Sequence, residues 1–202
     1  QSSLLSMPRG AAARSQAEAV RLARDPRGLD ARAGDAGGVP TLLVASGRGG
    51  AGATLVSALL AVAAAGEGVR VLLVDADDFV GPLALLLGVK PAAAWTDLRG
   101  GRVTPADVAT PVSTTLTLVA GGAPRLGGDA VAVAAAERRA CMRRLSVLAE
   151  NADLVVVDCG ARIDPVLAAI TPHAQERLVA VSAGSDPVGL AATYALCKAV
   201  HT

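Results

Sequence analysis

Five short apolar runs that alternate with segments of helical pattern set the strongest limit on how this chain can fold. The runs end in Gly, Asp or Ser, as strands buried on both faces of a sheet do. They are TLLVAS at 41–46, VRVLLVDAD at 69–77, TLTLVAGG at 115–122, DLVVVDCG at 153–160 and RLVAVSAG at 177–184. Helical segments are predicted at 53–68, 129–152, 164–174 and 186–200. The alternation predicts an α/β domain with a mainly parallel sheet flanked by helices, whose ligand sites lie at the carboxyl ends of the strands.

The first run leads into SGRGGAGAT at 46–54, directly before a helical segment. Gly47, Gly52 and Thr54 match the phosphate-loop spacing G-x-x-x-x-G-x-[ST]. Glycines let backbone N–H groups approach phosphate oxygens, a helix N-terminus favours negative charge, and a threonine hydroxyl can bind Mg²⁺. An ordinary glycine-rich turn is the alternative. The predicted nucleotide-binding residues are Gly47, Arg48, Gly49, Gly50, Ala51, Gly52, Ala53, Thr54 and Asp75.

The second and fourth apolar runs bring aspartates to the same edge of the predicted sheet. Asp75, Asp77 and Asp78 lie at the end of the second run, where carboxylates can hold Mg²⁺ through water or position an attacking water. If the site hydrolyses its ligand, Asp77 is the predicted catalytic residue. Asp158 follows four apolar residues at a strand end, a pattern whose aspartate serves Mg²⁺. Thr54 and Asp158 are therefore the predicted metal ligands. The alternatives are a helix cap at Asp77 and a solvated strand end at Asp158.

Composition excludes several classes of function. With one Phe, one Trp and one Tyr in 202 residues, the chain lacks the rings on which single-stranded nucleic acid stacks. A net charge of +1 without a basic tail argues against binding DNA through its phosphates. The 3 cysteines are not at metal-ligand spacing, and no apolar run is long enough to span a bilayer. We therefore expect a cytoplasmic protein with no direct nucleic-acid binding and no membrane segment.

The N-terminal part differs in composition from the rest of the chain. Residues 15–24, SQAEAVRLAR, predict a short helix with a capping box at its start. Residues 25–39 are rich in Gly, Pro, Asp and Arg, which predicts a flexible linker. A disordered tail is expected at 1–14, with 1–6 a remnant of cloning. The globular domain is then expected over 40–202.

Several of these motifs together resemble one family. SGRGGAGAT, VRVLLVDADDFVGPLALLLGV, LTLVAGG, DLVVVDCGARID and YALCKAV are similar to the MinD/ParA group of P-loop ATPases, and most to its flagellar-number regulator branch, FlhG or FleN. The resemblance runs from Thr41 to the C-terminus, and SQAEAVR at 15–21 resembles the branch's N-terminal D-Q-A-x-x-L-R segment. It implies a three-layer P-loop sandwich of the SIMIBI type, ATP or ADP with Mg²⁺ as ligand, and nucleotide-dependent homodimers.

The resemblance also implies a partner. In the family the N-terminal helix contacts the SRP-type GTPase FlhF and stimulates its hydrolysis. By resemblance, residues 15–24 bind such a GTPase through Gln16, Ala17, Val20 and Arg21. A helix too short to be stable alone can fold on binding, and docking on its own domain is the alternative. The implied function is bacterial control of flagellar number or placement, with polar association through partners. The alternative is a non-enzymatic adaptor of a polar, pilus or septum-placement system, because related regulators of those systems share the same core.

Departures from the family bear on the chemistry. Ala53 stands where the P-loop lysine contacts the β and γ phosphates. Losing one charged contact costs about 1.5–3 kcal/mol, roughly ten- to 150-fold in affinity, and hydrolysis suffers more because charge develops in the transition state. ATP hydrolysis is therefore expected to be slow or absent, as in a pseudo-ATPase. Arg48 corresponds to the family's signature lysine, which reaches the phosphate bound by the partner subunit, and an arginine could make that contact. The alternative is that Arg48 is a solvated loop residue. Family members continue beyond the YALCK helix, so either the chain is cut short at Thr202 or the protein is a reduced version of the family.

A dinucleotide-binding Rossmann oxidoreductase is the rival prediction. The loop also spells G-x-G-x-x-G, Asp75 follows at a suitable distance, and Tyr194 with Lys198 gives the Y-x-x-x-K pair of short-chain dehydrogenases. Against this, Ala51 and Ala53 stand where that family has glycine.

Four arginines lie within ERRACMRR at 137–144. Arg139 and Arg143 are four residues apart on one predicted helix face, with Arg138 and Arg144 nearby. The sequence predicts a solvated helix face, with a basic patch toward a partner as the alternative.

Overall fold

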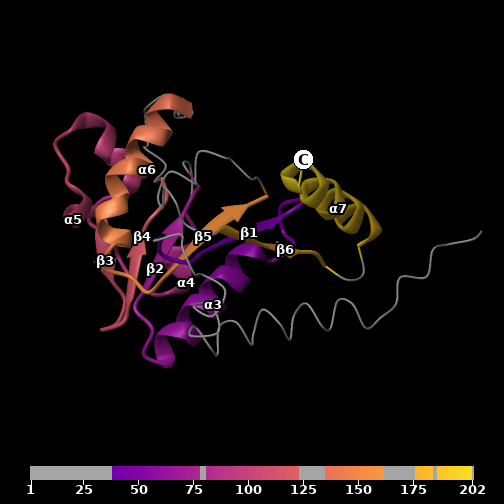
Figure 1. Ribbon diagram of the computed structural model, residues 1–202, viewed down its shortest axis with the longest axis horizontal. Coiled ribbons are helices and arrows are strands. Elements are labelled where there is room, and N and C mark those ends of the chain that lie inside the picture. Colours follow the sequence, from indigo (N-terminus) through magenta and orange to yellow (C-terminus); the bar gives the residue numbers. More distant parts are fainter. Residues whose placement is uncertain (1–37, 78–80, 123–134, 162–175, 184–185, 202) are drawn as a thin grey trace, which may run out of the picture.

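The computed structural model describes residues 38–77, 81–122, 135–161, 176–183 and 186–201. Within these ranges one six-stranded sheet has the order β3-β4-β2-β5-β1-β6 (Figure 1). Its strands are β1 (Thr41–Ser46), β2 (Val71–Asp75), β3 (Ala109–Pro111), β4 (Leu116–Val119), β5 (Leu154–Gly160) and β6 (Glu176–Val181). The helices are α3 (Ala53–Gly66), α4 (Leu83–Leu86), α5 (Pro105–Val108), α6 (Ala135–Ala149) and α7 (Pro187–His201), with the 3₁₀ helix η1 (Trp95–Gly100). Every strand pair is parallel except β3 with β4, which confirms the predicted mainly parallel α/β fold.

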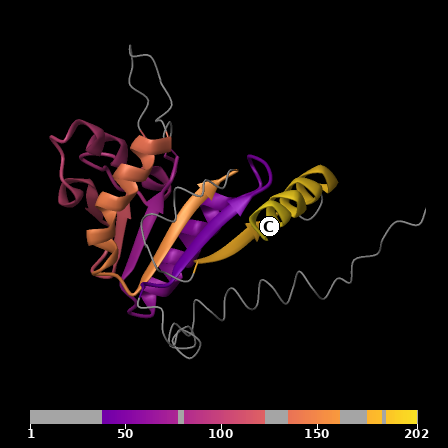
Figure 2. The same cartoon turned by 45° about the horizontal axis from the view of Figure 1, so that its top comes forward.

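The strands alternate their side chains between two apolar layers. Leu42 and Val44 of β1 pack with α3 and α4, whereas Leu43 and Ala45 pack with α6 and η1. Because successive side chains of a strand point to opposite faces, a strand covered on both sides must be apolar throughout. The result is a sheet between two helical layers, with α7 beside its β6 edge (Figures 1 and 2).

The strand order separates β1 from β2. β1 lies between β5 and β6, so the strand that carries Asp158 pairs directly with the strand that leads into the glycine-rich loop. A Rossmann unit instead places its first and second strands side by side. The order therefore argues against the oxidoreductase prediction. Tyr194, its second support, lies on α7 with 60% of its surface exposed.

The predicted solvated face of α6 is wrong at two arginines. Arg144 donates hydrogen bonds to the carbonyl oxygens of Leu98 and Val103, the latter at 2.9 Å, and so ties α6 to η1 and the loop after it. Arg138 is only 8% exposed. Arg139 and Arg143 are exposed as predicted.

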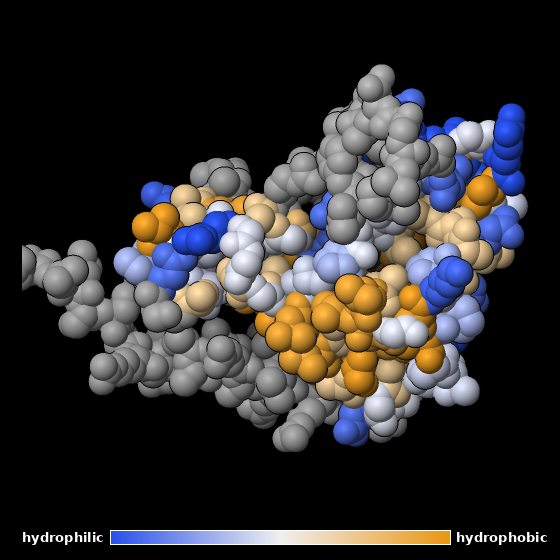
Figure 3. Space-filling model, turned by 180° about the vertical axis from the view of Figure 1, so that it is seen from behind, coloured by the Kyte–Doolittle hydropathy of each residue, from blue (hydrophilic) through white to orange (hydrophobic). Residues whose placement is uncertain are grey.

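An apolar surface covers part of α3 and α4. Figure 3 shows it as an orange area on the side of the molecule opposite to the view of Figure 1. Its large exposed side chains are Leu55, Leu59, Val62, Leu85 and Leu86. None of the helices within the described ranges is long and apolar enough to cross a membrane.

Some predicted segments lie outside the described residues. These are the tail, helix and linker predicted within 1–37, including the partner-binding residues Gln16, Ala17, Val20 and Arg21, and the helix predicted at 164–174. The beginning of the helix predicted at 129–152 is also outside them; its described part is α6.

Candidate functional site

The glycine-rich loop connects the end of β1 to the start of α3. The hydroxyl of Ser46 shares its one proton between the carbonyl oxygens of Arg48 at 2.8 Å and Gly160 at 3.2 Å, which anchors the loop to the end of β5. Gly50 and Gly52 have φ values of 80° and 95°, which residues with a side chain rarely adopt. Gly52 is the N-cap residue of α3. The loop thus has the open backbone and helix N-terminus on which a phosphate group can bind.

Gly47 lies in close contact with α7. A Cβ atom there would lie 2.1 Å from the backbone nitrogen of Thr193 on α7. The Gly47 N–H donates to Oγ1 of Thr193 at 3.0 Å. Gly47 therefore allows close contact between the loop and α7.

Arg48 points toward the beginning of α7. Its guanidinium forms an ion pair with Asp186 at 2.7 Å, and the two side chains are 53% and 27% exposed. A cavity lies beside the loop at the carboxyl ends of the strands, and neither Gly47 nor Arg48 lines it. The structure thus separates these two predicted nucleotide-binding residues from the others.

A cavity of about 790 Å³ collects the remaining predicted site residues. It lies at the carboxyl ends of β1, β2 and β5, the edge at which the sequence placed the site. The predicted residues that line it are Gly49, Gly50, Ala51, Gly52, Ala53, Thr54, Asp75, Asp77 and Asp158.

Asp75 is enclosed by the backbone of the loop that follows β2. Its carboxylate accepts hydrogen bonds from the N–H groups of Asp77 and Leu83, both at 3.2 Å. Burial raises its pKa to about 7, against the opposing effect of these two hydrogen bonds. Its carbonyl oxygen accepts a hydrogen bond from Nε1 of Trp95 at 2.9 Å. Asp75 therefore fixes the strand end and places a partly protonated carboxyl group at the cavity wall near neutral pH.

The two predicted metal ligands, Thr54 and Asp158, are neighbours. Asp158 is 3% exposed, and burial raises its pKa, while a hydrogen bond from the Thr54 side chain and one from the Gly160 N–H at 3.0 Å oppose that rise. The charge of Asp77 adds to the rise, so the third carboxylate is close as well. A hydroxyl group beside a carboxylate at the start of a phosphate-loop helix fits a Mg²⁺ ion that keeps water and phosphate oxygens as its other ligands.

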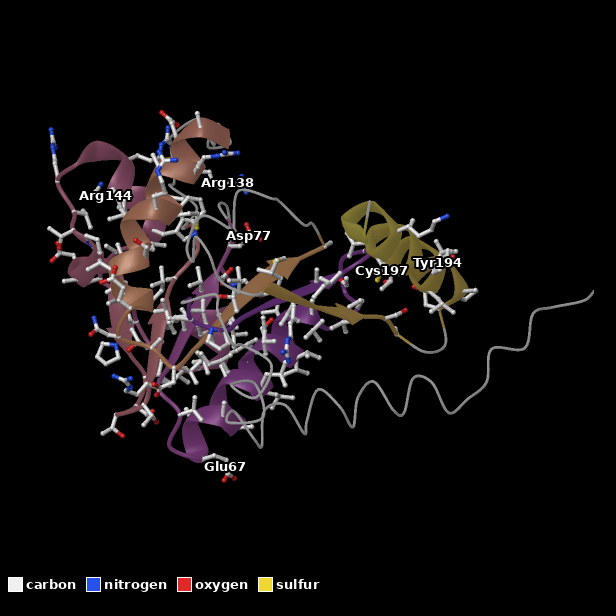
Figure 4. The ribbon with its side chains drawn as sticks, in the orientation of Figure 1. Glu67, Asp77, Arg138, Arg144, Tyr194 and Cys197 are labelled. Atoms are coloured by element: carbon white, nitrogen blue, oxygen red, sulfur yellow. The ribbon has the colours of Figure 1, made fainter. Side chains whose placement is uncertain are left out.

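Arg138 of α6 is the site residue that the sequence reasoning missed. It lines the cavity, and its Cζ lies 6.0 Å from the ring centroid of Trp95. Among the described residues that line the cavity it is the one cation, in a lining that also holds Asp75, Asp77 and Asp158 (Asp77 and Arg138 are labelled in Figure 4). The helical spacing could have predicted its burial, because Arg138 lies on the same helix face as Cys141, Met142 and Leu145, which are all buried.

The donor set fits a magnesium nucleotide better than a metal ion alone. Within the described parts of the chain, no group of three or more His, Cys, Asp and Glu side chains could hold a metal ion. A bound nucleotide supplies phosphate ligands of its own, so one carboxylate and one hydroxyl are sufficient from the protein. Thr54 and Asp158 would hold Mg²⁺, and the N–H groups of residues 49–54 would face the phosphates.

Sequence comparison finds one family and a curated relative. The family model described as cellulose biosynthesis protein BcsQ matches residues 39–196. Antiactivator FleN of Pseudomonas aeruginosa PAO1 is 32% identical over 168 residues, which are 81% of this chain and 57% of FleN. The chain thus spans a little over half the length of this relative.

Structure comparison finds P-loop ATPases. The septum site-determining protein MinD of Pyrococcus horikoshii OT3, complexed with Mg-ADP, has a TM-score of 0.65 at 21% identity, over 81% of this chain and 65% of MinD. A ParA family ATPase of Chlorobium tepidum TLS has a TM-score of 0.62 at 23% identity, over 79% of this chain and 68% of that one. At these identities the likeness shows the fold, and it confirms the predicted three-layer sandwich of the MinD/ParA type.

Proposed function

Since this chain belongs to the BcsQ family of MinD/ParA-type P-loop ATPases, we propose that it is an FlhG-like regulatory protein that binds Mg-ATP and Mg-ADP weakly. In this proposal it hydrolyses ATP slowly or not at all. It acts in the bacterial cytoplasm, where bound nucleotide promotes homodimers and partners bring it to its place of action.

One observation carries the nucleotide part of the proposal. The glycine loop, the helix N-terminus, Thr54 and Asp158 meet at one cavity although the P-loop lysine is replaced by Ala53. The backbone N–H groups, the helix N-terminus and the Mg²⁺ ligands do not depend on that lysine. The replacement therefore weakens phosphate binding without removing its geometry.

Calorimetric titration of Mg-ATP into the wild type and Ala53→Lys tests this part. Ala53 is 5% exposed but lines the cavity, so a longer side chain there has space to extend along the cavity wall. We expect weak binding by the wild type and roughly ten- to 150-fold tighter binding by the lysine variant, from the added charged contact. Ala53→Met, which adds length without charge, is the matched control and should not tighten binding.

Two results would contradict the nucleotide proposal. If only Ala53→Lys binds Mg-ATP, the natural chain is a non-enzymatic adaptor that has kept the fold of a nucleotide switch. If the wild type binds NADH and no adenosine triphosphate, the Rossmann oxidoreductase alternative would hold in spite of the strand order.

The partner part of the proposal concerns the N-terminal segment. We assign residues 15–24 as a helix that binds an FlhF-like GTPase, tethered by the linker 25–39 to the domain 40–202. Its support is the similarity to FleN, together with the resemblance of SQAEAVR to the N-terminal segment of the flagellar branch.

GTP hydrolysis by an FlhF-like GTPase tests the partner part. The wild type should stimulate hydrolysis, and Ala17→Asp should abolish the stimulation by placing a charge in the proposed contact. Ala19→Asp adds the same charge to the same segment, outside the proposed contact residues, and should retain stimulation. Equal activity of both variants would exclude this contact.

The family model favours a second setting for the same switch. Its description as a cellulose biosynthesis protein points to a role in cellulose production, with the nucleotide site unchanged. In that setting the chain would not affect the GTPase, and deleting its gene would alter cellulose output and leave flagellar number unchanged. A septum-placement or pilus-placement adaptor would change neither.

A further inference from the structure

We propose that Arg138 supplies the positive charge that the phosphate loop lacks at Ala53, by contacting the phosphate groups of the bound nucleotide. The proposal rests on the nucleotide binding proposed above and names the residue that makes it possible without the loop lysine. It assigns a ligand-binding role to α6, an element outside the phosphate-loop motif.

The position of Arg138 supports this role. It is 8% exposed overall yet lines the cavity that also contains Ala53, Thr54 and Asp158. A buried arginine is uncommon because its charge must be compensated. Here the charge lies at the wall of the same cavity as the glycine loop.

Trp95 holds the guanidinium in place. The indole is fully buried, and its Nε1 donates to the carbonyl oxygen of Asp75 at 2.9 Å. The ring lies 6.0 Å from Cζ of Arg138, within the range of a cation–π contact. The contact with Trp95 therefore places Arg138 near the end of β2, and a guanidinium that is already positioned loses little freedom when it binds an anion.

The charges of the cavity indicate what Arg138 can bind. The described lining residues include three aspartates and one arginine, so without the arginine nucleotide phosphates would meet carboxylates and the loop backbone. A guanidinium offers several N–H donors in one plane and pairs well with phosphate oxygens. An arginine that contacted only the aspartates would act on nucleotide affinity through its charge alone, without touching the phosphates.

Calorimetric titration of Mg-ADP measures how much the charge of Arg138 contributes to binding. Arg138→Met keeps much of the side chain's length and its contact with Trp95 but removes the charge. We expect it to bind roughly ten- to 150-fold more weakly than the wild type. Arg139→Met removes the charge of the neighbouring exposed residue and should bind as the wild type does. In Arg138→Met, the further change Ala53→Lys should restore binding, because the lysine replaces the lost cation.

The outcomes distinguish this inference from the proposed function. Wild-type affinity in Arg138→Met would overturn the role of Arg138 and leave nucleotide binding intact. Absence of binding by the wild type would overturn both, since Arg138 would then not replace the lysine.

A measurement on the wild type covers the case in which Arg138→Met does not fold. The ¹⁵N-labelled protein gives a side-chain Nε–H signal for Arg138, identified by its disappearance in Arg138→Lys. Addition of Mg-ADP should shift this signal and leave that of Arg139 in place. An unchanged Arg138 signal at saturation, established from the shifts of the loop amides, would overturn the inference.

Discussion

Gly47 tolerates no side chain because α7 crosses directly beside it. A Cβ atom at residue 47 would lie 2.1 Å from the Thr193 nitrogen and 2.2 Å from the Ala192 carbonyl carbon, and neither backbone can turn aside as a side chain can. Gly49, two residues on in the same loop, has no positive φ, and a Cβ atom there would meet nothing within 4 Å. The two glycines therefore have different requirements.

Gly47→Ala should lower the free energy of unfolding by about 1–3 kcal/mol, as overpacking does. Gly49→Ala should change it by less than about 0.5 kcal/mol, as is usual for an open surface site. Urea denaturation followed by circular dichroism, without nucleotide, measures both. Equal stabilities of the two variants would show that the loop and α7 are not in contact.

Single residues were predictable where local spacing determines them. Thr54 and Asp158 follow from a loop motif and a strand end, and the structure brings them together at the cavity. Gly47 and Arg48 belong to the same motif, yet their partners Thr193 and Asp186 lie 146 and 138 residues away in the sequence. Contacts of that range depend on how elements pack, which local spacing does not record.

At the scale of elements, strands were more predictable than helix faces. Each central strand is apolar on both faces, a pattern readable without knowing its neighbours. In α6 the charge run ERRACMRR suggested a solvated face, and Arg139 and Arg143 lie on one. Cys141, Met142 and Leu145 turn the other side of the helix to the core, and Arg138 lies on that buried side. The apolar stripe, rather than the charge, decides how such a helix is oriented.

The short elements between β2 and β4 were not predictable as elements. η1, α5 and β3 have between 3 and 6 residues each, too few for a clear helical or strand period. Their position depends on tertiary contacts, such as the hydrogen bonds from Arg144 to the carbonyls of Leu98 and Val103. Trp95 in η1 nevertheless matters for the site, because it links Arg138 to the end of β2.

At the scale of the whole molecule, the strand order creates the site. Because β5 separates β1 from β2, Asp158 faces the glycine loop on one side and Asp75 on the other. Asp75 and Asp158 are paired in the register of β2 and β5, so both carboxylates reach the same cavity. A different order of the same strands would divide these residues between separate places on the sheet edge.

The apolar surface on α3 and α4 adjoins this cavity. Leu55, Leu85 and Leu86 belong to this surface and also line the cavity. A ligand in the cavity would therefore lie next to an exposed apolar area. Nucleotide binding could then change the environment of the leucines that the cavity and the apolar surface share.

The central claim is that a magnesium nucleotide binds at the glycine loop although the loop has no lysine. Titration of Mg-ADP into the ¹⁵N-labelled wild type, followed through backbone amide signals, tests it most directly because it locates weak binding. The account predicts saturable shifts concentrated at residues 49–54 and at the ends of β2 and β5, with the far end of α3 unchanged. No shifts at millimolar Mg-ADP, or shifts centred away from the loop, would contradict it.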